Sequence, residues 1–197
     1  MYIVPLRFLL VMAQIESQSL SELFELTFSE GTIKSKHTNA RGFVFSSAAW
    51  AGIREDFEAV YSTGGATIME RMGFVFGKGL VKTEWRSNSD QAAFFEKVSD
   101  LAGSAGWGLI TLSAGDPTSD QARFRLKNCV FCSDIRGKTK PVCEFMAGVI
   151  RGAADELFGV EHQVKEETCM AMGDEACEFL LERRDPEVSF GVALHLF

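Results

Sequence analysis

Hydrophobic and polar residues alternate at two different spacings along this chain, and the first half has the helical one. Residues 14–29 alternate at near-helical spacing and are followed by Gly31, which predicts an entry helix. The short apolar run 43–45 predicts a strand. Ser46 or Ser47 is placed to cap a helix that starts immediately afterwards.

Two more helices are expected before the sheet begins. Gly64–Gly65 interrupts the helical pattern, and residues 66–80 resume it. Small residues recur within this second helix at Gly73 and Gly77, where they allow another backbone to approach closely. A third helix is expected over residues 91–106, with glycines at its end.

From residue 107 onward the pattern changes to a period of two. Residues 107–113 and 122–132 alternate around a turn-forming segment, which indicates a hairpin. A helix over 143–158, ended by Gly159, and strands near 160–168 and 176–183 complete the pattern. This order predicts an α+β fold with a mainly antiparallel, four- to five-stranded sheet and helices packed on one face.

The same pattern suggests three regions. Residues 1–30 are expected to form an N-terminal arm or helix that docks in an oligomer or on the domain, 31–184 the domain itself, and 185–197 a tail with an apolar end. The first dozen residues are apolar but short, and they contain Pro5 and Arg7. We therefore expect a docking segment with no membrane span, and a signal peptide is the less favoured alternative.

Composition narrows the class of protein. A chain of 197 residues with 46% hydrophobic content can bury one sizeable core. Twenty Lys and Arg against 27 Asp and Glu give a net charge of -7, which disfavours direct binding to nucleic acid. Five cysteines are too few for a disulfide scaffold and odd in number, so a reducing, cytoplasmic location is expected.

A group of cysteines and one glutamate carries the clearest chemistry. Cys143, Glu166, Cys169 and Cys177 supply three thiolates and a carboxylate, which are ligands that zinc accepts in tetrahedral geometry. A Gly-Asp turn between the last two cysteines would bring both thiols to one end of a hairpin. Four protein ligands leave no open position, as in a structural site. The alternative is that these are ordinary buried cysteines.

Two segments around these residues resemble a known family. PVCEFMAGVIRG at 141–152 and EETCMAMGDEACEF at 166–179 are similar to the signature of the 4-vinyl reductase domain family, also called the predicted hydrocarbon-binding family. The same module forms the phenol-sensing input domain of certain bacterial transcription activators. In those sensors the corresponding residues bind zinc, so the resemblance implies a structural Zn²⁺ at Cys143, Glu166, Cys169 and Cys177. The resemblance loosely covers residues 40–184.

A further thiol pair, Cys129 and Cys132, departs from the pattern expected of the phenol sensors. Residues three apart on a strand face opposite sides, so the pair needs a turn or a bulge to converge on one metal. One interpretation is a core cysteine and a surface cysteine. Others are a redox pair, a second metal or cofactor contact, or a rival metal set that includes Cys143.

The resemblance also implies an apolar cavity between the helices and the sheet. His37 and His162 do not fall where the phenol sensors place the histidine that holds the ligand hydroxyl, so a larger or less polar ligand is as plausible as a phenol. Aromatic residues are the candidates for the cavity wall, although each is individually typical of plain core. They are Phe43, Phe45, Trp50, Phe74, Phe76, Trp85, Trp107, Phe124 and Phe145.

These observations favour a non-catalytic protein that binds or senses a small hydrophobic, aromatic or tetrapyrrole-like molecule. The sequence has neither a G-x-G-x-x-G loop after a strand nor an evident Ser-His-Asp or Cys-His arrangement. A homodimer that acts through a separate effector protein is expected. The alternatives are a reductase or an accessory or carrier protein of tetrapyrrole metabolism, with Cys129 and Cys132 in redox or ligation roles, and a structural assembly subunit like those of vesicle-tethering complexes.

Overall fold

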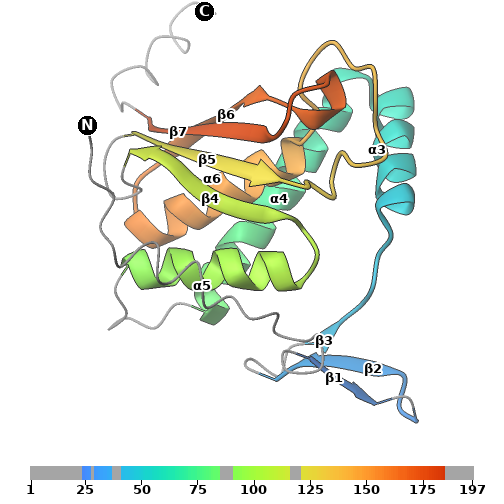
Figure 1. Cartoon of the computed structure of the whole chain (residues 1–197), viewed down its shortest axis with the longest axis vertical. Helices are drawn as coiled ribbons and strands as arrows, with labels where there is room; N and C mark the ends of the chain where they lie inside the picture. Colours follow the sequence, from blue (N-terminus) through green and yellow to red (C-terminus); the bar gives the residue numbers. More distant parts are fainter. Residues whose placement is uncertain (1–23, 28, 37–40, 85–90, 116–120, 185–197) are drawn as a thin grey trace, which may run out of the picture. The chain divides into compact units, whose positions relative to one another are not determined.

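The computed structural model describes residues 24–27, 29–36, 41–84, 91–115 and 121–184 (Figure 1). The chain divides into two compact units, residues 1–44 and 45–197. Within the described residues the first unit is an antiparallel three-stranded sheet in the order β1-β2-β3. Its strands are β1 (Phe24–Thr27), β2 (Thr32–Ser35) and β3 (Arg41–Gly42).

The helix expected over 14–29 is wrong for residues 24–27, which form β1, and most of that range lies outside the described residues. Gly31 has a positive φ of 61° and lies in the turn between β1 and β2. Thr27 pairs with Thr32 across that turn. Gly31 therefore provides the backbone conformation of a hairpin turn, where we expected the end of a helix.

Four helices of the second unit are described, and all four were expected. They are α3 (Ser47–Tyr61), α4 (Thr63–Glu84), α5 (Gln91–Ser104) and α6 (Glu144–Phe158). The side chain of Ser46 accepts a hydrogen bond from the backbone of Ala49 and caps α3 as predicted. Ser62, with a positive φ of 51°, separates α3 from α4, so Gly64–Gly65 lies inside α4 and does not break the pattern.

A four-stranded antiparallel sheet in the order β4-β5-β7-β6 confirms the expected fold class. Helices α4, α5 and α6 lie on one side of this sheet (Figure 1). Two expected strands need correction: residues 43–45 connect β3 to α3, and the strand expected over 122–132 ends at Lys127. The strands are β4 (Leu109–Gly115), β5 (Gln121–Lys127), β6 (His162–Thr168) and β7 (Cys177–Arg183).

The buried face of the sheet leads directly to the cysteines. Strands β5 and β7 pair so that Ala122 lies opposite Leu181, Phe124 opposite Phe179 and Leu126 opposite Cys177, and all six side chains are buried. Alternation at period two places them on one face. This apolar row therefore ends at the thiol of Cys177.

Helix α4 packs closely against α6, the helix that Cys143 precedes. A Cβ atom added to Gly73 would lie 1.9 Å from the carbonyl oxygen of Phe145, and one added to Gly148 would lie 2.0 Å from that of Glu70. Gly77 and Gly152 make equivalent approaches. The two backbones touch at four glycines, which confirms the close approach expected for α4 and sets where α6 begins.

Candidate metal centre

Five thiols and one carboxylate come together where β5, β6, β7 and α6 meet. Cys129 and Cys132 lie in the turn after β5, which begins at Asn128 with a positive φ of 54°. Cys143 is the residue immediately before α6. Glu166 and Cys169 lie at the end of β6 and just beyond it, and Cys177 begins β7. All five cysteines are free thiols and are buried, none of them more than 1% exposed.

The sulfur atoms are spaced like ligands of one tetrahedral ion. The Sγ atom of Cys143 lies 3.7 Å from that of Cys177 and 3.9 Å from that of Cys169. The Sγ atoms of Cys169 and Cys177 are 4.0 Å apart. Thiolates at about 2.3 Å from a tetrahedral zinc ion are separated by about 3.8 Å. The structure thus brings together the sulfur atoms of the expected set in a geometry that suits zinc.

Glu166 offers one oxygen to such an ion. Its Oε2 atom accepts a hydrogen bond of 2.8 Å from the backbone nitrogen of Cys143. Its Oε1 atom is buried and has no hydrogen-bond partner. One oxygen of the carboxylate lies within 4.8 Å of the sulfur atoms of Cys143, Cys169 and Cys177. An orphaned carboxylate oxygen beside three thiols is the donor arrangement that a divalent cation would satisfy.

The protein environment alone disfavours negative charge on Glu166 and on Cys143. Burial first, and the charge of Cys169 second, raise the pKa of Glu166 from 4.5 to about 9. The pKa of the Cys143 thiol is also raised, with hydrogen bonding to Cys129 as the largest cause. A bound cation would reverse this preference, because it stabilises the deprotonated ligands.

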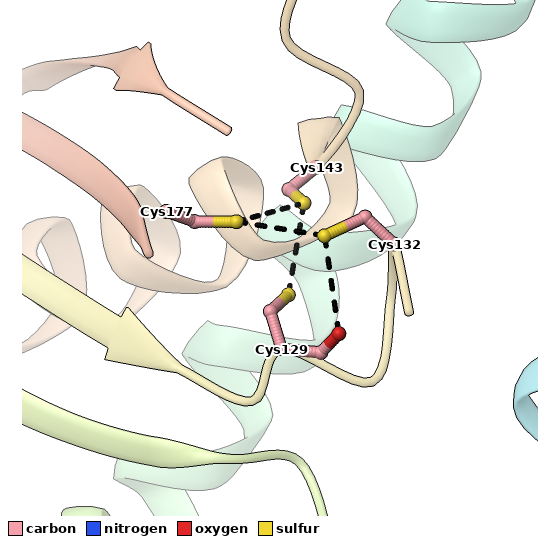
Figure 2. Close-up of side chains that lie close together, drawn as sticks. All are labelled: Cys129, Cys132, Cys143 and Cys177. Carbon is pink, nitrogen blue, oxygen red and sulfur yellow. Dashed lines mark hydrogen bonds between the residues drawn. The ribbon is translucent and has the colours of Figure 1, made fainter. Parts of the chain in front are cut away.

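A second set of four thiols is equally compact. Cys129, Cys132, Cys143 and Cys177 also lie with all their sulfur atoms within 4.8 Å of one another, and Figure 2 shows the four side chains pointing toward one another. The turn after β5 supplies the reversal that Cys129 and Cys132 need in order to converge. The interpretation of this pair as one core and one surface cysteine is therefore wrong, because both are fully buried.

Three hydrogen bonds shape the loops that hold the ligands. Asp174 of the expected Gly-Asp turn accepts a hydrogen bond of 2.9 Å from the backbone nitrogen of Cys169. The backbone nitrogen of Met170 donates to the sulfur of Cys177 at 3.5 Å. On the other side, the backbone nitrogen of Lys138 donates to the carbonyl of Ala171 and joins the loop before α6 to the loop after β6.

Arg54 connects α3 to the start of α6 through its contacts with Glu144 and Val142. The sequence did not predict this role. Its guanidinium contacts Glu58 at 2.8 Å and Glu144 at 2.9 Å, and its Nε atom donates to the carbonyl of Val142 at 3.2 Å. The Arg54 side chain is 5% exposed, and Val142 precedes Cys143. A charged residue in an otherwise amphipathic helix resembles a surface residue in the sequence, so only its burial reveals this role.

An aromatic cluster lies next to the thiols. Trp50, Phe76, Trp107, Phe131 and Phe145 form it, with neighbouring ring centroids 4.9–6.3 Å apart. Phe131 lies between Cys129 and Cys132 in the chain, and Phe145 comes two residues after Cys143. The same backbone segments therefore position two of the five rings and three of the thiols. Phe131 is the member that sequence reasoning missed, although it stands inside the Cys-x-x-Cys segment.

The remaining cavity candidates lie in different surroundings. Phe124 is buried in the row on the sheet, and Phe45 contacts Trp50 at the edge of the cluster. Phe43 is 81% exposed, and Phe74 is bordered by the cationic groups of three side chains. Trp85 lies outside the described residues. The structure thus brings Trp50, Phe76, Trp107 and Phe145 of the nine together in one cluster and places Phe74 and Phe124 elsewhere in the same unit.

A cavity of about 280 Å³ opens beside α3 and the start of α4. Arg54, Glu58, Lys140 and Glu144 contribute charged groups to its wall. None of the aromatic residues proposed for the cavity wall lines it, and its four charged side chains distinguish it from the apolar pocket expected from the sequence.

The fold and this centre define an α+β domain with a thiol-rich candidate metal site, and comparison with known proteins gives its family. Residues 122–183 match the V4R domain model. The matched range contains every thiol and the carboxylate described above. The resemblance seen in the sequence is confirmed.

Two curated relatives match a little over half of the chain. The uncharacterized protein MJ0745 of Methanocaldococcus jannaschii is 33% identical over 111 residues, which are 56% of this chain and 53% of that protein. The uncharacterized protein MJ1642 of the same organism is 27% identical over 110 residues, or 56% of this chain and 62% of that protein. This chain therefore spans less than two thirds of the length of these curated relatives.

One solved structure shares the fold over nearly its whole length. The phenol-responsive sensory domain of the transcription activator PoxR, crystallised with phenol, superimposes with a TM-score of 0.69 at 20% identity, covering 92% of both chains. A trafficking protein particle complex subunit 3 from Naegleria fowleri has a TM-score of 0.52 at 14% identity and covers 71% of this chain and 93% of its own. At these identities the two likenesses establish the fold.

The lengths and hydropathies of the helices can be compared with those of membrane-spanning helices. Within the described ranges, no helix is both long enough and apolar enough to cross a bilayer.

Proposed function

We propose that this protein is a non-catalytic binding or sensing protein for a small hydrophobic, aromatic or tetrapyrrole-like molecule. The V4R domain and the fold shared with a phenol-responsive sensory domain support a ligand-binding or sensing role. The observation that carries the proposal is the cluster of five aromatic rings, in which the half-buried Trp50 and Trp107 and the 44% exposed Phe76 adjoin the buried Phe131 and Phe145. Such rings offer apolar contact area to a flat ligand.

The metal assigned to the centre is a structural Zn²⁺ held by Cys143, Glu166, Cys169 and Cys177. The orphaned Oε1 of Glu166 and the spacing of the thiols support it. Zinc would join the loops that carry the ligands and, through Cys143, the segment leading to Phe145. Its binding free energy would be folding free energy, on the order of 10 kcal/mol. The metal is therefore proposed to hold the binding wall in place.

Occupancy of the ligand site is proposed to be passed on in a homodimer and to a separate effector protein. A row of exposed apolar side chains on α4, at Ile68, Met72 and Val75, supports a docking surface. Their spacing of four and three residues places them on one face of the helix. The free thiols support a reducing compartment such as the cytoplasm. Light scattering of the purified protein measures the oligomeric state.

The test of the ligand proposal is denaturing extraction and mass spectrometry of what copurifies with the protein, together with melting temperatures across a panel of aromatic, polycyclic and lipid molecules. A ligand that binds the native state alone raises the melting temperature. Visible absorbance of the fresh protein reports a tetrapyrrole. If nothing copurifies and no member of the panel shifts the melting temperature, the binding proposal is wrong.

A structural assembly subunit is the second candidate. The fold shared with a trafficking protein particle complex subunit favours it. Native mass spectrometry separates the two, because a small molecule bound at unit stoichiometry contradicts a purely structural subunit. A reductase or carrier of tetrapyrrole metabolism would instead copurify with a coloured ligand and lose it on turnover or transfer.

A further inference from the structure

The turn after β5 supplies two thiols that the proposed zinc set does not use. Cys129 and Cys132 are both 0% exposed. The sulfur of Cys129 lies 3.7 Å from that of Cys143, and the sulfur of Cys132 lies 3.5 Å from that of Cys177 (Figure 2). These two thiols therefore approach the two ligands of the proposed zinc set as closely as the ligands approach one another.

We propose that the centre binds two thiophilic divalent ions, with the second ion held by Cys129, Cys132, Cys143 and Cys177. Cys143 and Cys177 belong to both four-ligand sets and would bridge the two ions. This inference rests on the proposed zinc set, which supplies the first ion.

Ligand number supports two ions. The centre contains six donor groups, of which the two shared thiolates count for both ions, so each ion receives four protein ligands. Four is the coordination number of closed zinc sites. With a single ion at the first set, two thiols would be left fully buried beside it without a metal.

Charge also supports two ions. Five thiolates and one carboxylate carry six negative charges, and two divalent ions offset four of them, so the net charge is −2. One ion held by three thiolates and a carboxylate, with Cys129 and Cys132 as neutral thiols, also has a net charge of −2. The second ion therefore adds no net charge to the buried centre, and its binding releases the protons of Cys129 and Cys132 to solvent.

The local backbone is that of a metal-binding turn. Cys129-x-x-Cys132 has the two-residue spacing found in structural zinc sites. The backbone nitrogen of Cys132 donates to the carbonyl of Cys129 at 3.4 Å, and that of Ile135 donates to the carbonyl of Cys132 at 3.1 Å. The guanidinium of Arg136 also donates to the Cys132 carbonyl, at 3.1 Å, and brings a positive charge toward the thiols. Four thiolates select soft ions such as zinc or cadmium over magnesium.

The experiment is elemental analysis of the whole chain, purified under a phosphine reductant, loaded with zinc and dialysed. We expect two zinc ions per wild-type chain. The Cys129→Ser/Cys132→Ser double variant should hold one, and Ser133→Ala, a change in the same turn, should hold two. Cadmium NMR of the wild-type protein keeps the test decisive if the double variant does not fold, since two bridged ions give two mutually coupled resonances.

Each contrary result has a distinct meaning. One zinc ion in the wild type that is lost in Cys169→Ser overturns the second ion and leaves the proposed zinc set intact. One ion that persists in Cys169→Ser but is lost in the double variant overturns both assignments. No bound metal, or iron accompanied by acid-labile sulfide, also overturns both.

Discussion

Glu166 accepts a hydrogen bond from the backbone nitrogen of Cys143 through Oε2, at 2.8 Å, while its Oε1 is buried and unpartnered. One side chain at the end of β6 thus positions the residue immediately before α6 and keeps an oxygen available beside the thiols. Burial is the largest cause of its raised pKa, so the same position that suits a metal ligand is costly for a bare carboxylate.

Replacing Glu166 by Gln should change stability in opposite directions with and without metal. The folded pKa of Glu166 is raised from 4.5 to about 9, so in the metal-free protein its contribution to stability is fully present below pH 4.5 and is lost as the pH rises toward 9. The metal-free Glu166→Gln variant should therefore be more stable than the metal-free wild type at pH 8 by about 3–5 kcal/mol, and the two stabilities should converge near pH 4. Urea denaturation at both pH values measures this.

With zinc present the wild type should be more stable than Glu166→Gln, because the variant has lost an anionic ligand. Zinc affinity, measured by competition with a chromophoric chelator, should fall in Glu166→Gln. Glu167→Gln is the matched control, since Glu167 pairs with Arg123 in a partly exposed ion pair and should change stability by less than about 1 kcal/mol. A metal-free difference that is the same at both pH values would refute the burial argument.

Glycine substitutions should separate close backbone packing from helix propensity. Gly73→Ala and Gly148→Ala would place a Cβ atom within 2.0 Å of a backbone oxygen of the opposite helix, and each should cost about 2–3 kcal/mol or more. Gly79→Ala, also in α4, meets nothing within 4 Å and should be neutral or stabilise by up to about 1 kcal/mol. Denaturation midpoints that are equal for all three variants would contradict the contact between α4 and α6.

Much of the second unit could be predicted because periodicity and sequence motifs agree there. Ser46 and Gly159 bound their helices as expected, and the sheet strands alternate with a clear period of two. The proposed ligand set could be named because Glu166 and the cysteines stand in a motif. The row of buried residues on β5 follows directly from the alternation.

The features that the sequence did not predict share a physical cause: a local sequence pattern does not specify contacts between residues far apart in the chain. Residues 24–27 alternate in a way compatible with both helix and strand, and pairing with β2 decides for strand. Arg54 and Phe131 depend on partners far away in the chain, so their roles follow from packing alone. The burial of Cys132 likewise depends on a turn that the apparent continuation of β5 concealed.

Arg54→Ala should destabilise the protein by about 2–4 kcal/mol, because it removes two ion pairs and a hydrogen bond to the Val142 carbonyl, leaving that carbonyl buried without this donor. Arg54→Lys should restore little, since an ammonium group cannot reproduce the two-oxygen contact with Glu144. Arg71→Ala, which removes an exposed guanidinium over the Phe74 ring, is the control and should cost about 1 kcal/mol or less.

The effect of Arg54 should also depend on pH. Hydrogen bonding to Arg54 is the largest cause that lowers the pKa of Glu58 below 4.5. The stability from this pair is therefore present above pH 4.5 and is lost as the pH falls through the lowered pKa. The difference between wild type and Arg54→Ala in thermal unfolding should narrow on acidification below pH 4.5, and a constant difference would show that the Glu58 ion pair contributes little.

Phe76→Ala should weaken ligand binding more than it weakens the fold. The Phe76 ring is 44% exposed, yet it lies 5.3 Å from the Trp107 ring and 6.0 Å from the Phe145 ring, so it is the accessible edge of the aromatic cluster. Its removal should cost about 1–2 kcal/mol of stability, because nearly half of the residue is already exposed. The rise in melting temperature with an aromatic ligand, and the accompanying change in tryptophan emission, should fall several-fold. Val60→Ala, on α3 and 69% exposed, should leave both readouts unchanged. If the two variants bind the ligand equally well, the aromatic cluster is packed core and the ligand site must lie elsewhere.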